Sequence, residues 1–303
     1  MNTIPEFPEF KPVQLQDRDF IREVLRKYTP QTSEWSFTNL FIWQSHYGFQ
    51  WSMHRDWLIV MGRGEKNDTY ALQPVGPPSR AEVTRMLLKW LGEAKGEISA
   101  RIERADQRLV SEIEGAKDFL IEPSRDQFDY VYRSEDLIGL AGRKYHAKRN
   151  HINKFRRSHT FTYMPFANEY LKACLELADS WCEWRRCEED LNLVGEWEAV
   201  REALTHFEAL EIVGGVILIE DKVKAFALGE LLNDEMATVH VEKADPEIPG
   251  LYAVINQQFC ENSWPDVPYV NREQDLGEPG LRKAKLSYYP DHLVEKFQIR
   301  LDR

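Results

Sequence analysis

The sequence has 303 residues, 43% of them hydrophobic, with 50 acidic against 39 basic side chains and a formal net charge of −11. This is the composition of a globular protein, long enough for two domains with substantial cores. Such an acidic surface excludes loose binding of the whole molecule to nucleic acid or membranes, so any contact of that kind must be local.

In the first half of the chain, hydrophobic patterns and turn residues predict a strand, two helices, three short strands, and then alternating helices and strands. The first helix has Asp17 as its candidate N-cap. In chain order, we expect a strand at 10–15, helices at 17–28 and 35–46, strands at 49–54, 57–62 and 69–74, a helix at 79–94, a strand at 98–103, a helix at 106–115, and strands near 118–122 and 128–133.

The second half is predicted to repeat this order of elements. Three of its strands form a meander through tight turns at Asp221-Lys222 and Asn233-Asp234. In chain order, we expect a strand at 161–166, helices at 168–189 and 196–210, strands at 212–220, 223–232 and 236–244, a helix at 250–263, a strand at 267–271, a helix at 278–286, and a last strand within 293–301.

This repeated order is similar to that of the GNAT acyltransferase superfamily. We therefore expect an α/β (α+β) fold of two GNAT-like domains in tandem, each a mixed, mostly antiparallel sheet flanked by helices. The predicted segments are an N-terminal domain at 1–133, a connecting helix at 134–160, and a C-terminal domain at 161–303.

The connecting segment is strongly basic. Its central stretch, GRKYHAKRNHINKFRR (142–157), has seven Lys and Arg residues and no acid. As a helix it would place Tyr145, Ile152 and Phe155 on one side. The remaining residues suit the phosphates of a donor, and the candidates are Lys148, Arg149, Asn150, Lys154 and Arg157. The anion could be an aminoacylated tRNA end, coenzyme A or a lipid head group; alternatively, the helix is solvated or packs against the acids of 182–190.

Two stretches, NREQDLGEPGLRKAKLSYYP (271–290) and GRKYHAKRNHINKF (142–155), resemble bacterial proteins with the phosphatidylglycerol lysyltransferase C-terminal-like domain. Many of those proteins are soluble and of unassigned activity. The resemblance implies a tandem GNAT fold and a relation to Fem-type transferases, which use aminoacyl-tRNA. Because the sequence lacks the membrane-embedded portion of the lipid-modifying enzymes, we do not expect a lysyl-lipid role.

Acyl transfer to an amine needs an oriented donor, a base and donors for the oxyanion. His240 and Glu242 lie two apart on a predicted strand and would share a face, which makes Glu242 the candidate general base and His240 its neighbour. The alternative is a solvent-facing pair.

The resemblance places Lys285 where Fem-like transferases have a lysine that contacts the activated acyl end. Gly250, at the start of a predicted helix, is the candidate phosphate cradle of that helix.

The C-terminal motif supplies the candidate substrate-binding residues, because it follows the end of a predicted strand. These are Asn271, Arg272, Glu273, Asp275, Arg282 and Tyr288. Alternatively, pairs such as Arg272 with Asp275 or Glu273 with Arg282 are ordinary ion pairs that hold the loop together.

Further patterns exclude other classes of protein. The four cysteines have no CxxC spacing, so we expect reduced, packed thiols and no metal site. The N-terminus does not resemble a signal peptide, and the longest apolar stretch, at 212–219, is too short to span a bilayer, so we expect a cytoplasmic protein without an integral membrane segment.

The leading hypothesis is an acyl- or aminoacyl-transferase, acting on an amine or hydroxyl acceptor, with a phosphate-bearing donor such as aminoacyl-tRNA. The alternatives are an acetyl-coenzyme A-dependent N-acetyltransferase, disfavoured by the glycine-poor loop before 251, and a non-catalytic GNAT-derived module that binds an anion.

Overall fold

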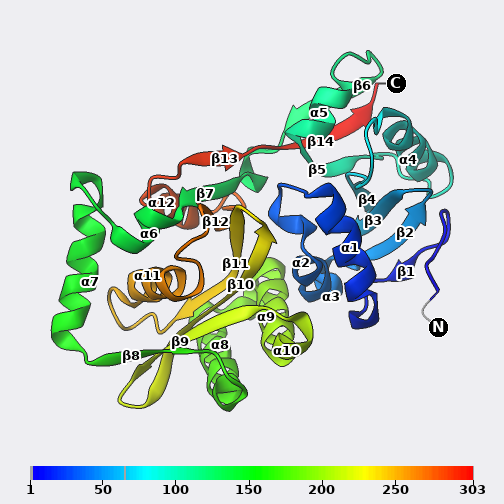
Figure 1. Ribbon diagram of the computed structural model, residues 1–303. Helices are drawn as coiled ribbons and strands as arrows, with labels where there is room; N and C mark the ends of the chain where they lie inside the picture. The colour runs from blue at the N-terminus through cyan, green and yellow to red at the C-terminus, as the bar shows by residue number, and fades with distance from the viewer. Residues whose placement is uncertain (1–2, 65, 303) are drawn as a thin grey trace. The chain divides into compact units, whose positions relative to one another are not determined.

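The computed structural model describes residues 3–64 and 66–302, and its chain forms two compact units (Figure 1). Unit 1 contains residues 1–129, 274–278 and 293–303, and unit 2 contains residues 130–273 and 279–292. The contacts thus divide the chain differently from the predicted segments 1–133, 134–160 and 161–303: the basic helix belongs to unit 2, and the last strand belongs to unit 1.

Unit 1 is built on a seven-stranded sheet in the order β1-β2-β3-β4-β5-β14-β6. Neighbouring strands in this order pair antiparallel, except for β4 and β5, which are parallel. The strands are β1 (Lys11–Pro12), β2 (Gln50–His54), β3 (Trp57–Arg63), β4 (Thr69–Leu72), β5 (Ile102–Asp106), β6 (Phe119–Pro123) and β14 (Lys296–Leu301).

The helices of unit 1 are α1 (Arg18–Tyr28), α2 (Phe37–Ile42), α3 (Gln44–Tyr47), α4 (Ala81–Glu93) and α5 (Gln107–Ile113). Apolar residues of α4 recur at Val83, Leu87, Leu88 and Leu91, on one face of the helix, and all four are buried against the sheet. This face and the inner side of α5 make the core of the unit.

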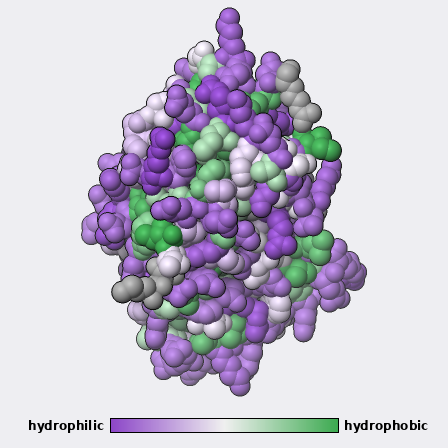
Figure 2. All heavy atoms as spheres, turned by 90° about the vertical axis from the view of Figure 1, so that its right-hand side faces the viewer, coloured by the Kyte–Doolittle hydropathy of each residue, from purple (hydrophilic) through white to green (hydrophobic). Residues whose placement is uncertain are grey.

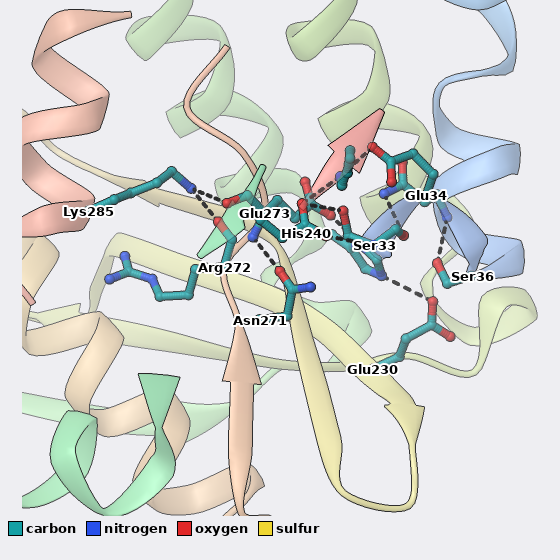
Figure 3. A network of polar contacts seen from close by, with 12 residues as sticks. Ser33, Glu34, Ser36, Glu230, His240, Asn271, Arg272, Glu273 and Lys285 are labelled. Atoms are coloured by element: carbon teal, nitrogen blue, oxygen red, sulfur yellow. Dashed lines mark hydrogen bonds and ion pairs between the residues drawn. The ribbon is translucent and has the colours of Figure 1, made fainter. Parts of the chain in front are cut away.

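A buried lysine organises the interior of unit 1. Lys296, the first residue of β14, is completely buried, and its Nζ lies 2.6 Å from both Glu34 Oε1 and Asp129 Oδ1. Asp129 also accepts hydrogen bonds from the backbone N–H and the hydroxyl of Ser33, at 2.8 and 3.0 Å. Figure 3 shows Ser33 and Glu34 in this network. One ammonium thus holds two carboxylates away from water.

Unit 2 is built on a second seven-stranded sheet in the order β13-β7-β12-β11-β10-β9-β8. Its meander pairs antiparallel, and β11 pairs in parallel with β12, as β4 does with β5. The strands are β7 (Asp129–Arg133), β8 (Phe161–Pro165), β9 (Val213–Ile219), β10 (Lys222–Asn233), β11 (Met236–Ala244), β12 (Tyr269–Asn271) and β13 (His292–Val294).

Helices cover both faces of this sheet. Glu242 contacts Asn256 on α11 (Leu251–Ser263), whereas the next residue, Lys243, contacts Trp181 on α8 (Leu171–Arg185). Because successive side chains of a strand point to opposite faces, α8 and α11 lie on opposite sides of the sheet. The other helices are α6 (Ser134–Gly139), α7 (His146–Ser158), α9 (Leu191–Thr205), α10 (Phe207–Leu210) and α12 (Pro279–Leu286).

The basic segment forms α7, preceded by a short turn of helix at 143–145. Tyr145, Ile152 and Phe155 are all buried, which confirms the predicted apolar side. Gly250, with φ of 90°, lies directly under this helix, since a Cβ added there would be 2.7 Å from the carbonyl oxygen of His151. Glycine at this position therefore allows α7 to pack over the start of α11.

Three sequence expectations are wrong in detail. The strand predicted at 98–103 begins only at Ile102, because Ile98 is exposed and lies in the preceding turn. Asp17 precedes α1 but does not cap it; its carboxylate accepts hydrogen bonds from Gln14 and from the indole of Trp51.

The third concerns the cysteines. Cys182 and Cys187 are joined by a disulfide across the end of α8, whereas Cys174 and Cys260 are free and buried. The expectation of four reduced thiols is therefore wrong. A five-residue separation along a helix end brings the two sulfurs together, which the linear spacing did not indicate.

The surface is predominantly polar. On the face drawn in Figure 2, hydrophobic residues form small groups separated by hydrophilic ones. Within the described ranges, none of the helices combines the length and apolar character that crossing a bilayer requires.

Candidate active site

Two cationic side chains from distant parts of the sequence, Lys148 and Arg272, meet at the ring of Tyr288 in unit 2. The Nζ of Lys148, on α7, lies 3.8 Å from the ring centre, and the guanidinium carbon of Arg272, just after β12, lies 4.9 Å from it. The same guanidinium lies 5.8 Å from the ring of Tyr132 on β7. Two cations thus share one buried aromatic ring, an arrangement stabilised by the negative face of the ring.

Arg272 is bound to Glu242 on β11. Its Nη2 lies 3.1 Å from Oε1 and 3.2 Å from Oε2 of that carboxylate, and the amide of Asn256 donates to Oε2 at 3.2 Å. The other terminal nitrogen, Nη1, is buried and has no hydrogen-bond partner among the residues that the structure describes. A guanidinium can donate through all of its N–H groups, so Nη1 is a donor that a bound anion would satisfy.

The positive charge at this site exceeds the negative charge. Burial lowers the pKa of Lys148, Arg272 lowers it further, and Glu242 only partly opposes them, so that the pKa is about 8. Lysine ordinarily titrates near 10.5. The lowered pKa means that the Lys148 ammonium is costly here, first because it is removed from water and then because Arg272 is near. A bound anion would remove that cost.

His240 occupies a β-bulge of β11. Leu228 and Gly229 of β10 pair with Val241 and Val239, which leaves His240 as the extra residue between them. The bulge interrupts the regular alternation from which the shared face of His240 and Glu242 was predicted.

The His240 ring is held between two carboxylates. Its Nδ1 lies 2.9 Å from Glu273 Oε1 and its Nε2 lies 3.0 Å from Glu230 Oε1, and Figure 3 shows these residues close to Asn271 and Arg272. Burial by itself lowers the pKa of His240, but the hydrogen bonds to Glu230 and Glu273 raise it to about 9. At neutral pH the ring is therefore an imidazolium, which can donate protons and does not act as a base.

Lys285 holds the segment that carries Arg272. Its ammonium donates to the backbone carbonyls of Arg272 and Glu273 (Figure 3). Two tyrosines fix the same region: the hydroxyl of Tyr132 donates to the carbonyl of Lys285, and that of Tyr145 donates to the carbonyl of Tyr288, both at 2.9 Å. Sequence reasoning missed Tyr132 and the hydroxyl of Tyr145, since nothing in a strand or helix pattern marks a hydroxyl that reaches a distant carbonyl.

Of the five predicted phosphate ligands on α7, Lys148 alone contacts Tyr288. Arg149 donates to the carbonyls of Leu140 and Gly142 and so closes the end of α6. Arg157 donates to the carbonyl of Asn153 at 3.2 Å, and Asn150 contacts His146 within the same helix. Lys154 is exposed.

The first turn of α11, proposed as a phosphate cradle, is internally bonded. The N–H of Leu251 donates to Ile248, and the N–H groups of Ala253 and Val254 donate to the carbonyl of Gly250. The predicted role of Gly250 in phosphate binding stays a prediction; in the structure this glycine allows the close approach of α7.

The remaining predicted substrate residues divide between the two units. Asn271 is completely buried, and its Oδ1 accepts the N–H of Glu273, which forms the turn after β12. Arg282 lies one turn before Lys285 on α12. Asp275 belongs to unit 1, where it accepts the N–H of Gly277 and pairs with Arg125 at 3.5 Å.

These contacts also test one of the ion pairs considered from the sequence, that of Arg272 with Asp275. Arg272 pairs with Glu242, and Asp275 pairs with Arg125, so the pair of Arg272 with Asp275 is not the one formed. In residues 3–64 and 66–302, no cluster of three or more His, Cys, Asp or Glu side chains is placed to hold a metal ion.

Comparisons with known proteins point to one family. Residues 25–300 match the family model described as phosphatidylglycerol lysyltransferase, C-terminal. A crystal structure of a conserved protein of unknown function from Bacteroides thetaiotaomicron is 34% identical, covers 99% of this chain and 100% of its own, and superposes with a TM-score of 0.89.

More distant structures share the fold. The L-PGS structure from Bacillus licheniformis is 13% identical, covers 100% of this chain and 95% of its own, and has a TM-score of 0.66. FemX is 11% identical, with 97% of each chain covered and a TM-score of 0.58. The predicted fold class is confirmed: two mostly antiparallel sheets flanked by helices, in the tandem GNAT-like arrangement.

Proposed function

Because the chain belongs to the phosphatidylglycerol lysyltransferase C-terminal family, we propose that it is an acyl- or aminoacyl-transferase that takes a phosphate-bearing donor. The donor we favour is aminoacyl-tRNA, and the acceptor is an amine or a hydroxyl. The observation that carries the proposal is the meeting of Lys148, Arg272 and Glu242 around Tyr288 in unit 2.

The charge of this cluster supports an anionic ligand. Lys148 and Arg272 face a single carboxylate, and Arg272 Nη1 has no protein partner in the described part of the chain. Both groups can donate to the oxyanion of a tetrahedral intermediate or to an oxygen of the donor. Exposed basic residues of α7, such as Lys154 and Arg156, would add phosphate contacts outside the site.

In the proposed reaction, the acceptor amine attacks the ester carbon of the donor, and the C–O bond to the leaving ribose hydroxyl breaks. Glu242 takes the proton of the attacking nitrogen and gives it to the leaving ribose oxygen, which departs as a hydroxyl. Arg272 orients Glu242, and Lys285 positions the 272–273 backbone. His240, being protonated, acts through Glu273 as a positioning residue and not as the base.

A second candidate is a module that binds an anion without catalysis. It is favoured by the pairing of Glu242, which already accepts hydrogen bonds from Arg272 and Asn256. Both oxygens of the carboxylate thus have protein partners, which leaves it less accessible to a substrate.

The test uses tRNA charged with radiolabelled amino acids and a panel of amine and hydroxyl acceptors. Transfer of label by the native protein and its loss in Glu242→Gln would support the transferase. Glu261→Gln, on an exposed part of α11, is the matched control and should retain activity. Binding of charged tRNA without transfer to any acceptor would favour the second candidate, whereas no binding at low salt would contradict aminoacyl-tRNA as the donor.

A further inference from the structure

Unit 2 has a groove of about 850 Å³ on the side of the sheet covered by α8. One wall is a face of α8, formed by Tyr170, Ala173, Leu177, Trp181 and Trp184, which recur every three or four residues. Leu218 of β9 and Val223 of β10 line the opposite side. Trp184 is 58% exposed, so the groove presents an aromatic surface to solvent.

The rim of this groove is acidic. Five carboxylates and two lysines line it, namely Glu169, Glu176, Asp221, Asp245, Glu247, Lys222 and Lys224. Lys224 is neutralised by Asp245, at 2.9 Å. Glu176 is paired with Lys172, at 3.7 Å. The remaining acids, Glu169, Asp221 and Glu247, are opposed by Lys222 and leave a net negative charge beside the apolar, aromatic wall. This combination is complementary to a cation with a hydrocarbon stem.

Trp181 already binds such a group within the protein. The ammonium of Lys243 lies 3.2 Å from the centre of the Trp181 ring, and the same ammonium pairs with Glu196 at 2.6 Å. The indole N–H of Trp181 donates to the hydroxyl of Tyr252 at 2.8 Å, which fixes the plane of the ring. An ammonium held by a tryptophan face and a carboxylate is therefore a contact that this region makes in its own interior.

We propose that the groove between α8 and the β9–β10 turn is a binding site for a small aliphatic amine cation. The ammonium lies among the rim carboxylates, and the methylene stem packs on Trp184 and Leu177. Alkyl ammonium ions suit this site because the aromatic faces attract the charge while the stem is removed from water. The inference is independent of the proposed transferase activity, since none of the groove residues belongs to the cluster around Tyr288.

The test measures ligand binding by NMR of the tryptophan indole N–H groups. Cadaverine is the probe, pentanediol is its neutral analogue and glutarate is its anionic counterpart. We expect cadaverine to shift the Trp184 and Trp181 signals at low salt, with weaker binding as salt is added. The buried Trp35 of unit 1 is the internal reference and should not shift.

Two sets of variants separate the contribution of the aromatic wall from that of the rim carboxylates. Trp184→Leu should weaken cadaverine binding by about tenfold, because the methylene stem loses the aromatic surface on which it packs. The double variant Asp221→Asn/Glu247→Gln should weaken it without removing an aromatic ring. Glu208→Gln, an exposed acid on α10 outside the groove, is the control and should leave the affinity unchanged.

Equal binding of pentanediol and cadaverine would overturn the proposal, because the groove would then be merely apolar. Absence of any shift with cadaverine at low salt would overturn it as well. Loss of transfer activity in a Glu242 variant with cadaverine binding intact would leave this inference standing, so the two proposals fail separately.

Discussion

Lys148 and Tyr288, from opposite ends of unit 2 in the sequence, stack as a cation on an aromatic ring, with 3.8 Å between the ammonium nitrogen and the ring centre. The basic helix α7 thereby reaches the same point as the C-terminal motif. This contact places a lysine of lowered pKa beside Arg272.

Lys148 should react with acylating reagents at a lower pH than an ordinary lysine, because its pKa is about 8 against an ordinary value of 10.5. Labelling with acetic anhydride at pH 8, followed by peptide mass spectrometry, should find Lys148 among the first lysines modified. Lys154→Met should not change this labelling. Arg272→Met should slow it at pH 8, since removing the neighbouring charge raises the pKa of Lys148.

His240 makes the stability of the protein depend on pH on the alkaline side. Its folded pKa, about 9, lies above the unfolded value of 6.5, so its contribution is full below pH 6.5 and is lost as pH rises through 9. That contribution is at most roughly 3 kcal/mol. Urea unfolding between pH 6.5 and 10 should show the decline, and His240→Gln should flatten it. NMR titration of the imidazole with a midpoint below 6.5 would contradict the assignment.

Arg272→Met should lower transfer activity by about 100-fold, because it removes both the unpaired Nη1 donor and the partner of Glu242. Arg272→Lys should recover only part of this, since one ammonium cannot reproduce the guanidinium geometry. The transfer rates of Arg272→Met, of Glu242→Gln and of the variant that combines them form a double-mutant cycle, which measures the coupling between the two residues. Fully additive losses would show that the two residues act independently, against the arrangement described above.

Lys296→Met should destabilise the protein by roughly 3–5 kcal/mol, because it removes the ammonium that pairs with the buried carboxylates of Glu34 and Asp129. Chemical unfolding of the variant measures the effect. Lys117→Met, at an exposed position of the same unit, should change the unfolding free energy little. Adding Asp129→Asn to Lys296→Met should restore part of the loss, and a further loss would contradict the explanation.

Cys174 and Cys260 should not react with thiol reagents in the native protein. Both are completely buried, and burial raises the pKa of each thiol to about 12. Titration with a chromogenic disulfide at pH 8 should detect them only after denaturation. Rapid reaction of either one in the native state, located by mass spectrometry, would show that its region opens readily.

The sequence by itself determined the order of the elements, the repetition of that order, and the apolar side of α7. These features follow from local periodicity and turn residues. The resemblance to the family rested on two stretches, 142–155 and 271–290, and the comparisons confirm it. The structure shows that the basic helix and the C-terminal motif meet at Tyr288.

The tertiary structure alone decided which groups are paired and which are not. Glu242 pairs with Arg272, His240 is protonated between two carboxylates at a bulge, and Lys296 crosses to the sheet of the other half of the sequence. Charge, partner and protonation state depend on burial and on neighbours distant in sequence. Local periodicity contains no information about burial or about neighbours that are distant in the sequence, so only the tertiary structure shows these pairs and protonation states.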